Sequence, residues 1–395
     1  MKRKTWLNRN IFAMGLTSFF SDFGHEMATA ILPMFLISIG GSAALLGLIE
    51  GLADASTSFM KLFSGWYSDY IGKRKPFATV GYFLTAIGVG SFFFALSWVH
   101  VLISRVIAWL GRGTREPARD ALLVDSTEPK YYGRVFGFHR GMDTLGAIAG
   151  PALAYFLIKS MQPRSIFLIA FIPSIISFIV IAFFVKELKK AGREKKSFIL
   201  SFKLLPFKFR LFLLPVFIFG LGNFADTLLI LRVTQILTPL KGPVIAGSLA
   251  VLFYLIRNIF YAAFSLPIGI AADRFGKKRF LFLGYFIAGI TAIGFILNFT
   301  NLLFLGFLFL LAGIAISITD ALERTVAADY LPENLRGTGY GALAAVNGIG
   351  DFASSAVVGF LWSKISPITG FGYAAVFMIM GAFFLLILRK NSKIN

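Results

Sequence analysis

Residues 65–76 read Gly-Trp-Tyr-Ser-Asp-Tyr-Ile-Gly-Lys-Arg-Lys-Pro, a polar stretch at the end of a long apolar run. A close copy, Gly-Ile-Ala-Ala-Asp-Arg-Phe-Gly-Lys-Lys-Arg, occupies residues 269–279. The aspartates of the two copies, Asp69 and Asp273, are 204 residues apart (273 − 69). A loop that occurs twice, at a spacing of about half the chain, indicates two copies of one larger unit.

The same offset relates acidic residues elsewhere in the chain. It matches Asp22 with Asp226 and Asp125 with Asp329. It also matches several glycines, among them Gly65 with Gly269, Gly90 with Gly294, Gly137 with Gly341 and Gly146 with Gly350. Because glycine makes up 39 of the 395 residues, the aspartates and loop lysines carry the argument. They predict two homologous halves in the same orientation.

Composition indicates that these halves lie in a membrane. Of the 395 residues, 57% are hydrophobic and 15% are charged, whereas soluble domains carry about 25% charged residues. Most segments between charge clusters are apolar runs of roughly 18–25 residues, the length that crosses a bilayer as a helix. The sequence therefore predicts an all-α polytopic membrane protein.

Charge clusters and Gly or Pro residues divide the chain into twelve expected transmembrane helices, six in each half. They cover residues 11–38, 43–70, 77–97, 99–125, 133–158, 164–185, 211–238, 243–273, 280–298, 301–329, 337–363 and 368–388. We expect an N-terminal six-helix bundle at residues 1–185, a basic cytoplasmic linker at 186–210 and a C-terminal six-helix bundle at 211–395.

The net charge of +20 comes mostly from Lys and Arg near the termini, in the repeated loops and in the linker. The positive-inside rule then places both termini in the cytoplasm. We expect a monomer in a bacterial inner membrane, surrounded by lipid, with no nucleic-acid partner. The chain has no cysteine and no phosphate-binding loop, and its spacings do not suggest a metal site, so we expect neither a cofactor nor enzymatic activity.

The repeated loop carries a known family signature. Its first copy matches G-x-x-x-D-x-x-G-[RK]-[RK] with Gly65, Asp69, Gly72, Lys73 and Arg74, and its second copy with Gly269, Asp273, Gly276, Lys277 and Lys278. The chain thus resembles a major facilitator superfamily (MFS) secondary transporter over nearly its whole length. The resemblance implies that the two halves face one another across a central cavity and open it to each side in turn. It also implies that these loops act as a gate.

The first expected helix carries Asp22, His25 and Glu26 on one face. A charge inside a bilayer costs at least about 2.5–3.5 kcal/mol, so such residues are functional candidates. Two carboxylates four residues apart repel, which favours uptake of a proton by one of them. The alternative is a structural role, in which each acid is paired with an arginine on a neighbouring helix.

The fourth expected helix is the most charged, with Arg112, Arg115, Glu116, Arg119 and Asp120 within one arc. Its excess of arginine predicts that Arg112 and Arg115 bind an anionic group of the transported solute. The alternative is that these cations neutralise acids across the bundle. Because Arg119 lies towards the cytoplasmic end, we expect it to belong to the gate.

The fifth expected helix carries His139 and Asp143, followed by Gly146-Ala-Ile-Ala-Gly150-Pro151. The glycine spacing predicts close helix packing. It also resembles part of the fifth-helix motif of the drug:proton antiporters.

The second half is less charged, and its candidates are Asp226, Arg232, Asn258, Asp320 and Glu323. Asp226 repeats Asp22 and is the best candidate for a second proton site. Asp320 and Glu323 repeat Glu116 and Arg119, and we assign Glu323 to the gate.

These residues predict a proton-coupled transporter of a small organic solute with an anionic group, driven by the proton gradient. Asp22 or Glu26, with Asp226, would exchange protons. Export of amphipathic drug-like compounds and import of a carboxylate metal chelate such as a siderophore remain alternatives. A non-transporting sensor is a further alternative.

Overall fold

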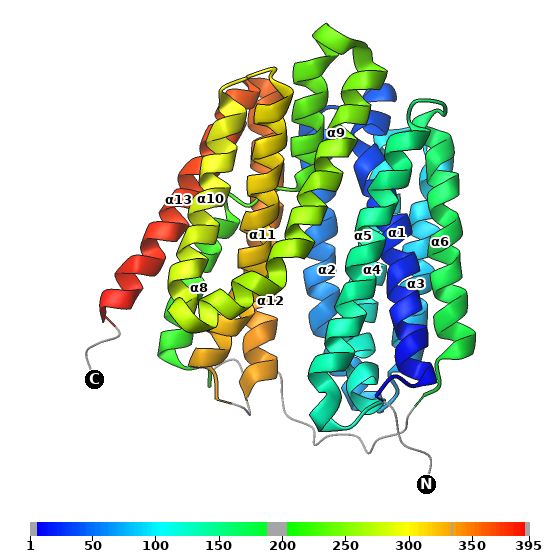
Figure 1. The fold of residues 1–395 in the computed structure, drawn as a ribbon, viewed down its shortest axis with the longest axis vertical. Coiled ribbons are helices and arrows are strands. Elements are labelled where there is room, and N and C mark those ends of the chain that lie inside the picture. The colour runs from blue at the N-terminus through cyan, green and yellow to red at the C-terminus, as the bar shows by residue number, and fades with distance from the viewer. Residues whose placement is uncertain (1–5, 188–203, 333–334, 392–395) are drawn as a thin grey trace. The chain divides into compact units, whose positions relative to one another are not determined.

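The computed structural model describes residues 6–187, 204–332 and 335–391, and within these ranges it is helical, with no strand. Contacts divide the chain into two compact units (Figure 1). Unit 1 comprises Met1–Gly40 and Ser56–Lys195, and unit 2 comprises Gly41–Ala55 and Lys196–Asn395. Most of the expected linker, residues 188–203, lies outside the described residues.

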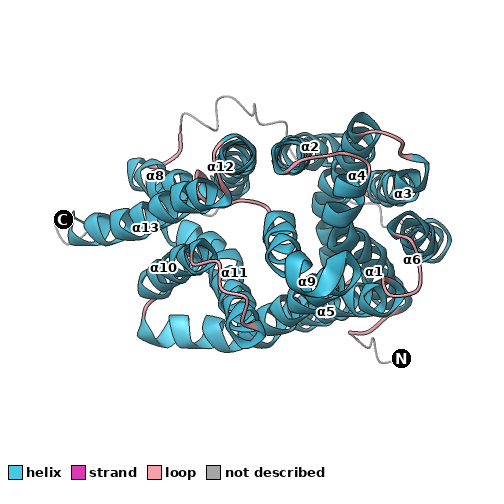
Figure 2. Ribbon diagram, turned by 90° about the horizontal axis from the view of Figure 1, so that it is seen from above, coloured by secondary structure: helices cyan, strands magenta, loops and turns pink. Residues whose placement is uncertain are grey.

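Unit 1 is a helical bundle. Its helices are α1 (Arg9–Ser38), the later part of α2 (Ala43–Ile71), α3 (Lys75–Ser91), α4 (Trp98–Asp125), α5 (Tyr132–Leu157) and α6 (Pro163–Phe184), with the short 3₁₀ turns η1 (Phe92–Phe94) and η2 (Pro129–Tyr131). Helix α1 packs mainly on α5 and α6, and α3 packs on α4, as the view in Figure 2 shows.

Two glycines bring α5 against α1. A Cβ added to Gly146 would lie 3.0 Å from the backbone nitrogen of Phe23, and one added to Gly150 would lie 2.8 Å from that of Met27. Any side chain would therefore push the helices apart. This confirms the close packing expected from the glycine spacing.

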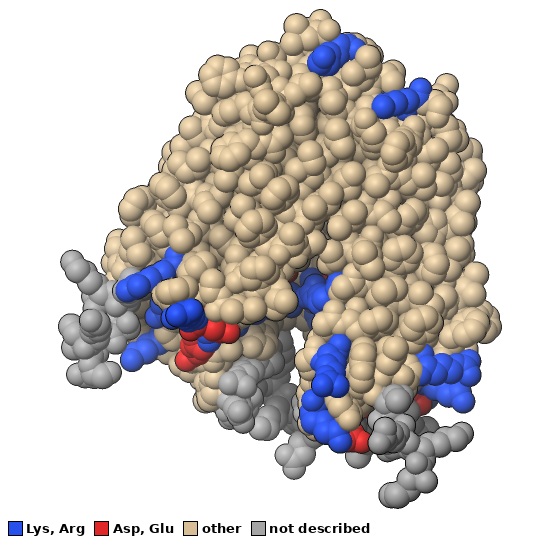
Figure 3. Space-filling model, in the orientation of Figure 1, with Lys and Arg blue, Asp and Glu red and all other residues tan. Residues whose placement is uncertain are grey.

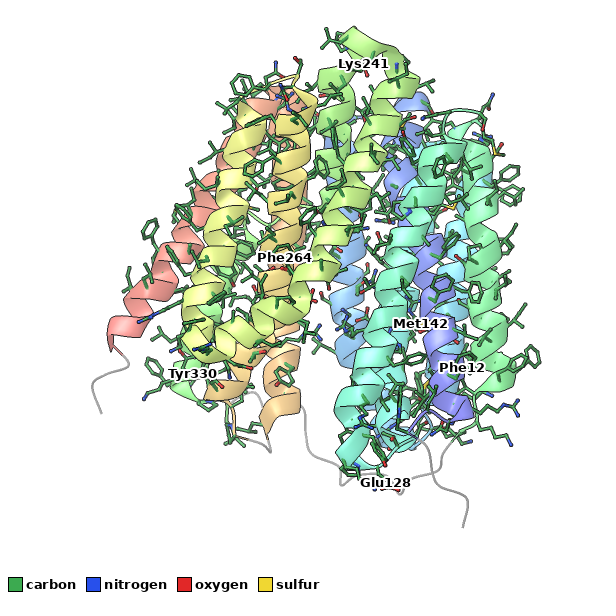
Figure 4. All side chains as sticks on the ribbon, viewed as in Figure 1. Phe12, Glu128, Met142, Lys241, Phe264 and Tyr330 are labelled. Atoms are coloured by element: carbon green, nitrogen blue, oxygen red, sulfur yellow. The ribbon has the colours of Figure 1, made fainter. Side chains whose placement is uncertain are left out.

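Unit 2 contains α8 (Phe207–Gly220), α9 (Asp226–Phe275), α10 (Lys277–Ile296), α11 (Leu302–Tyr330), α12 (Arg336–Lys364) and α13 (Pro367–Asn391). The long α9 is two arms that meet at Gly242, where φ is +74°. A left-handed backbone favours glycine, and Pro243 follows it. Lys241 labels this bend in Figure 4.

The seventh expected helix, residues 211–238, is not continuous. Helix α8 ends at Gly220 and α9 begins at Asp226. In the break, the Asn223 side chain donates to Asp351 (2.8 Å) and the backbone N–H of Ala225 donates to the Ser355 hydroxyl (3.0 Å). The second bond satisfies a backbone N–H that an unbroken helix would satisfy internally, and the first fixes the side chain of the break to α12.

Seven described helices are long and apolar enough to cross a membrane by length and composition alone. They are α3 with η1, α6, α9, α10, α11, α12 and α13. Helices α1, α2, α4 and α5 are not among them, and they hold most of the charged candidates of unit 1. In Figure 3 the visible basic side chains of each unit gather mainly at one end.

Candidate functional site

The charged stripe of α4 lies inside unit 1. Arg105 and Arg115 are 2% and 1% exposed. A buried guanidinium needs hydrogen bonds and opposite charge to offset its lost hydration. The neighbouring helices α1, α2 and α3 supply these partners.

Arg115 joins α4 to α1 and α3. Its Nη2 lies 3.4 Å from Asp22 Oδ1, and Nη1 donates to the Ser21 hydroxyl. Its guanidinium carbon lies 4.3 Å from the centre of the Tyr82 ring. Arg115, predicted to bind an anion, thus forms an ion pair with Asp22, the predicted proton site.

Arg112 and Glu116 form a second group with α2. Glu116 accepts from Arg112 Nε at 3.0 Å and from Lys61 Nζ at 2.7 Å. The charges of Asp22 and Glu26 also act on Arg112. Arg112 is therefore shared among several acids, and its side chain is 28% exposed.

His25 lies beside this group in an aromatic setting. It is 1% exposed, and its ring centre lies 4.2 Å from that of Trp109 on α4. The guanidinium carbons of Arg105 and Arg112 lie 4.6 and 5.0 Å from the Trp109 ring centre. Such cation–π contacts stabilise desolvated arginines by about 2 kcal/mol.

Arg119 lies one turn further along α4. Its Nη2 bonds Asp120 at 3.0 Å, and the Asp120 side chain is 45% exposed. The structure therefore brings Asp22, His25, Arg112, Arg115 and Glu116 into one part of unit 1. Arg119 faces a partner on its own helix.

The second proton candidate, Asp226, is the first residue of α9. It pairs with Arg257 on the other arm of the same helix. Arg257 in turn donates to Asn258 at 2.8 Å. Asp226 and Asn258 are thus connected through an arginine that was not among the predicted site residues. Its position next to Asn258 in the eighth expected helix could have indicated it.

Arg232 does not join this cluster. It donates to the carbonyl of Phe295 (3.3 Å) and to the side chain of Asn298 (3.1 Å) at the end of α10. A cation is stabilised at a helix C-terminus by the backbone dipoles. This contact gives Arg232 a structural explanation.

The acids of α11 are held by neutral donors. Asp320 accepts from Tyr261 at 2.8 Å. Glu323 is 7% exposed and accepts from Tyr285 at 2.6 Å and from Asn347 at 2.7 Å. The sequence did not indicate Tyr285, because its hydroxyl finds Glu323 only through packing of α10 on α11.

The two repeated loops turn at glycines in the left-handed region, with φ of +71° at Gly72 and +110° at Gly276. A basic residue of each loop then reaches the end of another helix in its own unit. Arg74 pairs with Asp125 of α4, and Lys277 lies 3.0 Å from Asp329 of α11.

The remaining gate candidates lie at the same helix ends. A Cβ on Gly65 would meet Pro117 of α4 at 3.4 Å, whereas Gly269 faces open space. Lys73 and Asp273 are exposed. Asp69 lies in the last turn of α2, and its side chain is outside the described part of the chain.

The sequence model of the Major Facilitator Superfamily matches residues 14–256 and 234–394. The chain belongs to this superfamily. An uncharacterised MFS-type transporter of Methanocaldococcus jannaschii is 34% identical over 382 residues, which cover 96% of this chain and 95% of the relative. The protein is therefore an integral membrane transporter of twelve helices in two related halves.

Two further comparisons concern named proteins. The quinolone resistance protein NorA of Staphylococcus aureus is 25% identical over 225 residues, 55% of this chain and 57% of NorA. A mutant structure of the nucleoside transporter NupG superposes with a TM-score of 0.82 at 14% identity, covering 96% of this chain and all of that chain. The second likeness concerns the fold alone.

Proposed function

We propose that this MFS protein is a proton-coupled secondary transporter that moves a small organic solute with an anionic group by alternating access. The observation that carries the proposal is the buried Asp22–Arg115 ion pair, with Arg112 beside it. Charges at membrane depth are costly and are retained mainly where they act on ions or substrates.

The ion pair suggests how proton and solute could be coupled. While Asp22 is ionised, it neutralises Arg115. When Asp22 takes up a proton, Arg115 loses its counter-ion, and a buried unpaired cation is strongly destabilising. An anionic group of the solute would then replace the carboxylate, with Arg112 as a second contact. Binding of the proton and of the anion would favour each other.

Unit 2 would contribute a second proton site at Asp226, whose partner is Arg257. The repeated loops would stabilise one conformation through Arg74–Asp125 and Lys277–Asp329. We place both termini on the cytoplasmic side of a bacterial inner membrane, because the basic residues of each unit gather at one of its ends.

Export of amphipathic compounds is the second candidate. It is supported by the similarity to NorA, whose name refers to quinolone resistance, and by the antiporter-like Gly146–Pro151 segment. Quinolones carry a carboxylate, so this candidate is compatible with binding by arginine. Import of a carboxylate metal chelate is the corresponding symport hypothesis.

A vesicle assay separates these candidates. The purified protein is reconstituted with an internal pH-sensitive dye and tested with di- and tricarboxylates, ferric citrate and norfloxacin under proton gradients of either sign. Symport predicts that an external solute acidifies the lumen, and antiport predicts that it removes lumenal protons. Solute flux without proton movement in the wild type would contradict proton coupling, and absence of any flux would favour a sensor.

Asp22→Asn is the matched test of the site. We expect the variant to lose gradient-driven accumulation. Glu128→Gln, an exposed residue of unit 1 paired with Lys130, is the control and should transport normally.

A further inference from the structure

Helix α5 carries a histidine and an aspartate that the mechanism above does not use. His139 and Asp143 are one turn apart, and His139 Nδ1 lies 3.5 Å from Asp143 Oδ2. They are 1% and 9% exposed. Both share the helix face of Gly146 and Gly150, which press against the backbone of α1 near Phe23. The close contact between α1 and α5 therefore encloses this pair.

Each member of the pair has a second polar atom with an unmet hydrogen-bonding capacity. Asp143 Oδ1 and His139 Nε2 are buried and have no hydrogen-bond partner among the described residues. An unsatisfied buried polar group costs about 1–3 kcal/mol, so two in one His–Asp pair need an explanation.

The pair is within electrostatic range of the proposed proton site. Asp143 and Asp22 repel each other. Besides Asp22, the charged groups that act on the pair or on Tyr82 lie on α4 and α5. They are Arg112, Arg115, Arg119, Asp120 and Arg140. Arginines keep their charge, so only the acids, the histidine and the tyrosine can exchange protons here.

Met142 lies beside the pair on α5, and a Cβ on Gly15 of α1 would meet its Cγ at 3.3 Å. In Figure 4, Met142 marks this stretch of α5 alongside α1, and Phe12 and Glu128 mark the end of unit 1 that bears η2. His139 precedes Asp143 by one turn and therefore lies closer to that end. Asp120, which acts on His139, has a 45% exposed side chain.

We propose that His139 and Asp143 form a relay site for protons in unit 1, through which Asp22 exchanges protons with the η2 end of the unit. The proposal rests on the proton coupling proposed above. In each transfer one O–H or N–H bond breaks and one forms. Through one bridging water, the Asp22 carboxyl gives its proton to Oδ1 of the Asp143 carboxylate, and Asp143 gives a proton to His139 Nδ1. His139 releases the proton from Nε2 towards Asp120.

Infrared difference spectra of the purified full-length protein, recorded across a pH series, test the first half of this proposal without a solute. Protonated buried carboxyls give a C=O signal, and two interacting acids titrate in two steps that belong to the pair. We expect the wild type to show two steps that Asp143→Asn and Asp22→Asn each reduce to one, while the signals of other acids such as Asp226 and Glu323 stay the same in all variants. The double variant should lose both steps.

The outcomes separate this proposal from the proposed function. A titration that is unchanged in Asp143→Asn but altered in Asp22→Asn overturns the His139–Asp143 site and leaves Asp22 as the proton site of unit 1. A titration that neither variant changes contradicts both. Glu128→Gln should match the wild type, and unfolding temperatures show whether each variant is folded.

The role of His139 is tested by kinetics. His139→Gln keeps a hydrogen-bonding side chain but cannot relay a proton. After a rapid pH jump, the carboxyl signal should relax at least about tenfold more slowly in this variant, with the two titration steps retained. A histidine that only packs between helices would leave the rate unchanged, and that result would remove His139 from the route.

Discussion

Helix α1 and the α8–α9 segment are the same part of the two halves, yet they differ at the repeated aspartate. Asp22 and Asp226 are equivalent by the 204-residue repeat (226 − 22). Helix α1 runs unbroken from Arg9 to Ser38, whereas the helix of the second half is interrupted before Asp226. Asp22 therefore lies within a helix, and Asp226 begins one.

Local sequence explains the difference. Residues 18–22 read Ser-Phe-Phe-Ser-Asp, and residues 222–226 read Gly-Asn-Phe-Ala-Asp. Glycine is about 1 kcal/mol worse than alanine inside a helix, and the Asn223 side chain finds a better partner in Asp351. The cost of the glycine and the two long-range hydrogen bonds of Asn223 and Ala225 together favour the break.

The consequence is electrostatic. A carboxylate at a helix N-terminus gains about 0.3–1 kcal/mol from the backbone dipoles, and the Asp226 side chain is 32% exposed. Asp22 has no helix end to stabilise it and is 12% exposed, so its charge depends on Arg115 and Arg112. We infer that the two halves stabilise equivalent carboxylates by different means.

The largest expected effect comes from removing Arg115, which tests whether the two carboxylates are stabilised by different means. Arg115→Met leaves Asp22 without its ion-pair partner, and loss of one partner of a buried pair costs about 3–5 kcal/mol. Arg257→Met should cost less, because Asp226 keeps the helix dipole and contact with solvent. Unfolding of the purified variants in an SDS titration measures both effects.

The double variant Asp22→Asn/Arg115→Met provides the control. It removes both charges and should recover most of the lost stability while transport stays lost. Equal destabilisation by Arg115→Met and Arg257→Met would show that the two carboxylates depend on their arginines alike.

The second prediction concerns the helix break. In Gly222→Ala, the new Cβ would lie 2.9 Å from the backbone nitrogen of Met378 on α13. Overpacking of this kind costs about 1–3 kcal/mol. The repeat-equivalent change, Ser18→Ala, should have almost no effect, because the buried Ser18 hydroxyl has no hydrogen-bond partner among the described residues. The same unfolding titration measures both variants. Equal effects of Gly222→Ala and Ser18→Ala would mean that the break is not packed more tightly against α13 than α1 is at Ser18.

The third prediction sharpens the comparison between α4 and α11. Glu116 and Asp320 are equivalent by the repeat, but Glu116 binds Lys61 and Arg112 whereas Asp320 binds Tyr261. Its neighbour Glu323 is also held by neutral donors. Tyr285→Phe should cost about 1–2 kcal/mol, because buried Glu323 loses one of its donors.

Tyr261→Phe is the matched control for Tyr285→Phe. Asp320 is exposed and can bind water in place of the lost hydroxyl. The unfolding midpoint of Tyr261→Phe should therefore stay close to that of the wild type. A larger loss in Tyr261→Phe than in Tyr285→Phe would contradict the assignment of Glu323 as the buried acid of α11.

The sequence was enough for the architecture because the repeat and the apolar run lengths are local and periodic signals. It also indicated Asp22, Arg115 and Glu116 as candidate residues, since charges in apolar helices are conspicuous. It could not choose their partners. Whether Arg115 meets Asp22, or Tyr285 meets Glu323, depends on helix rotation and packing. The break before Asp226 depends on Asp351 and Ser355, more than 120 residues away.

The smallest expected effect compares the two loop contacts. The side chains of Arg74 and Asp125 are 19% and 3% exposed, whereas those of Lys277 and Asp329 are 28% and 51% exposed. Exposed ion pairs contribute only about 0–1 kcal/mol. Asp329→Asn should therefore change the unfolding midpoint little, and Asp125→Asn should lower it more because buried Arg74 contacts are lost. In salt titrations only the Lys277–Asp329 contact should weaken measurably, since buried pairs are screened less. An equal response of both variants to mutation and salt would mean that the two loops are held alike, and that the halves differ only at their membrane-embedded carboxylates.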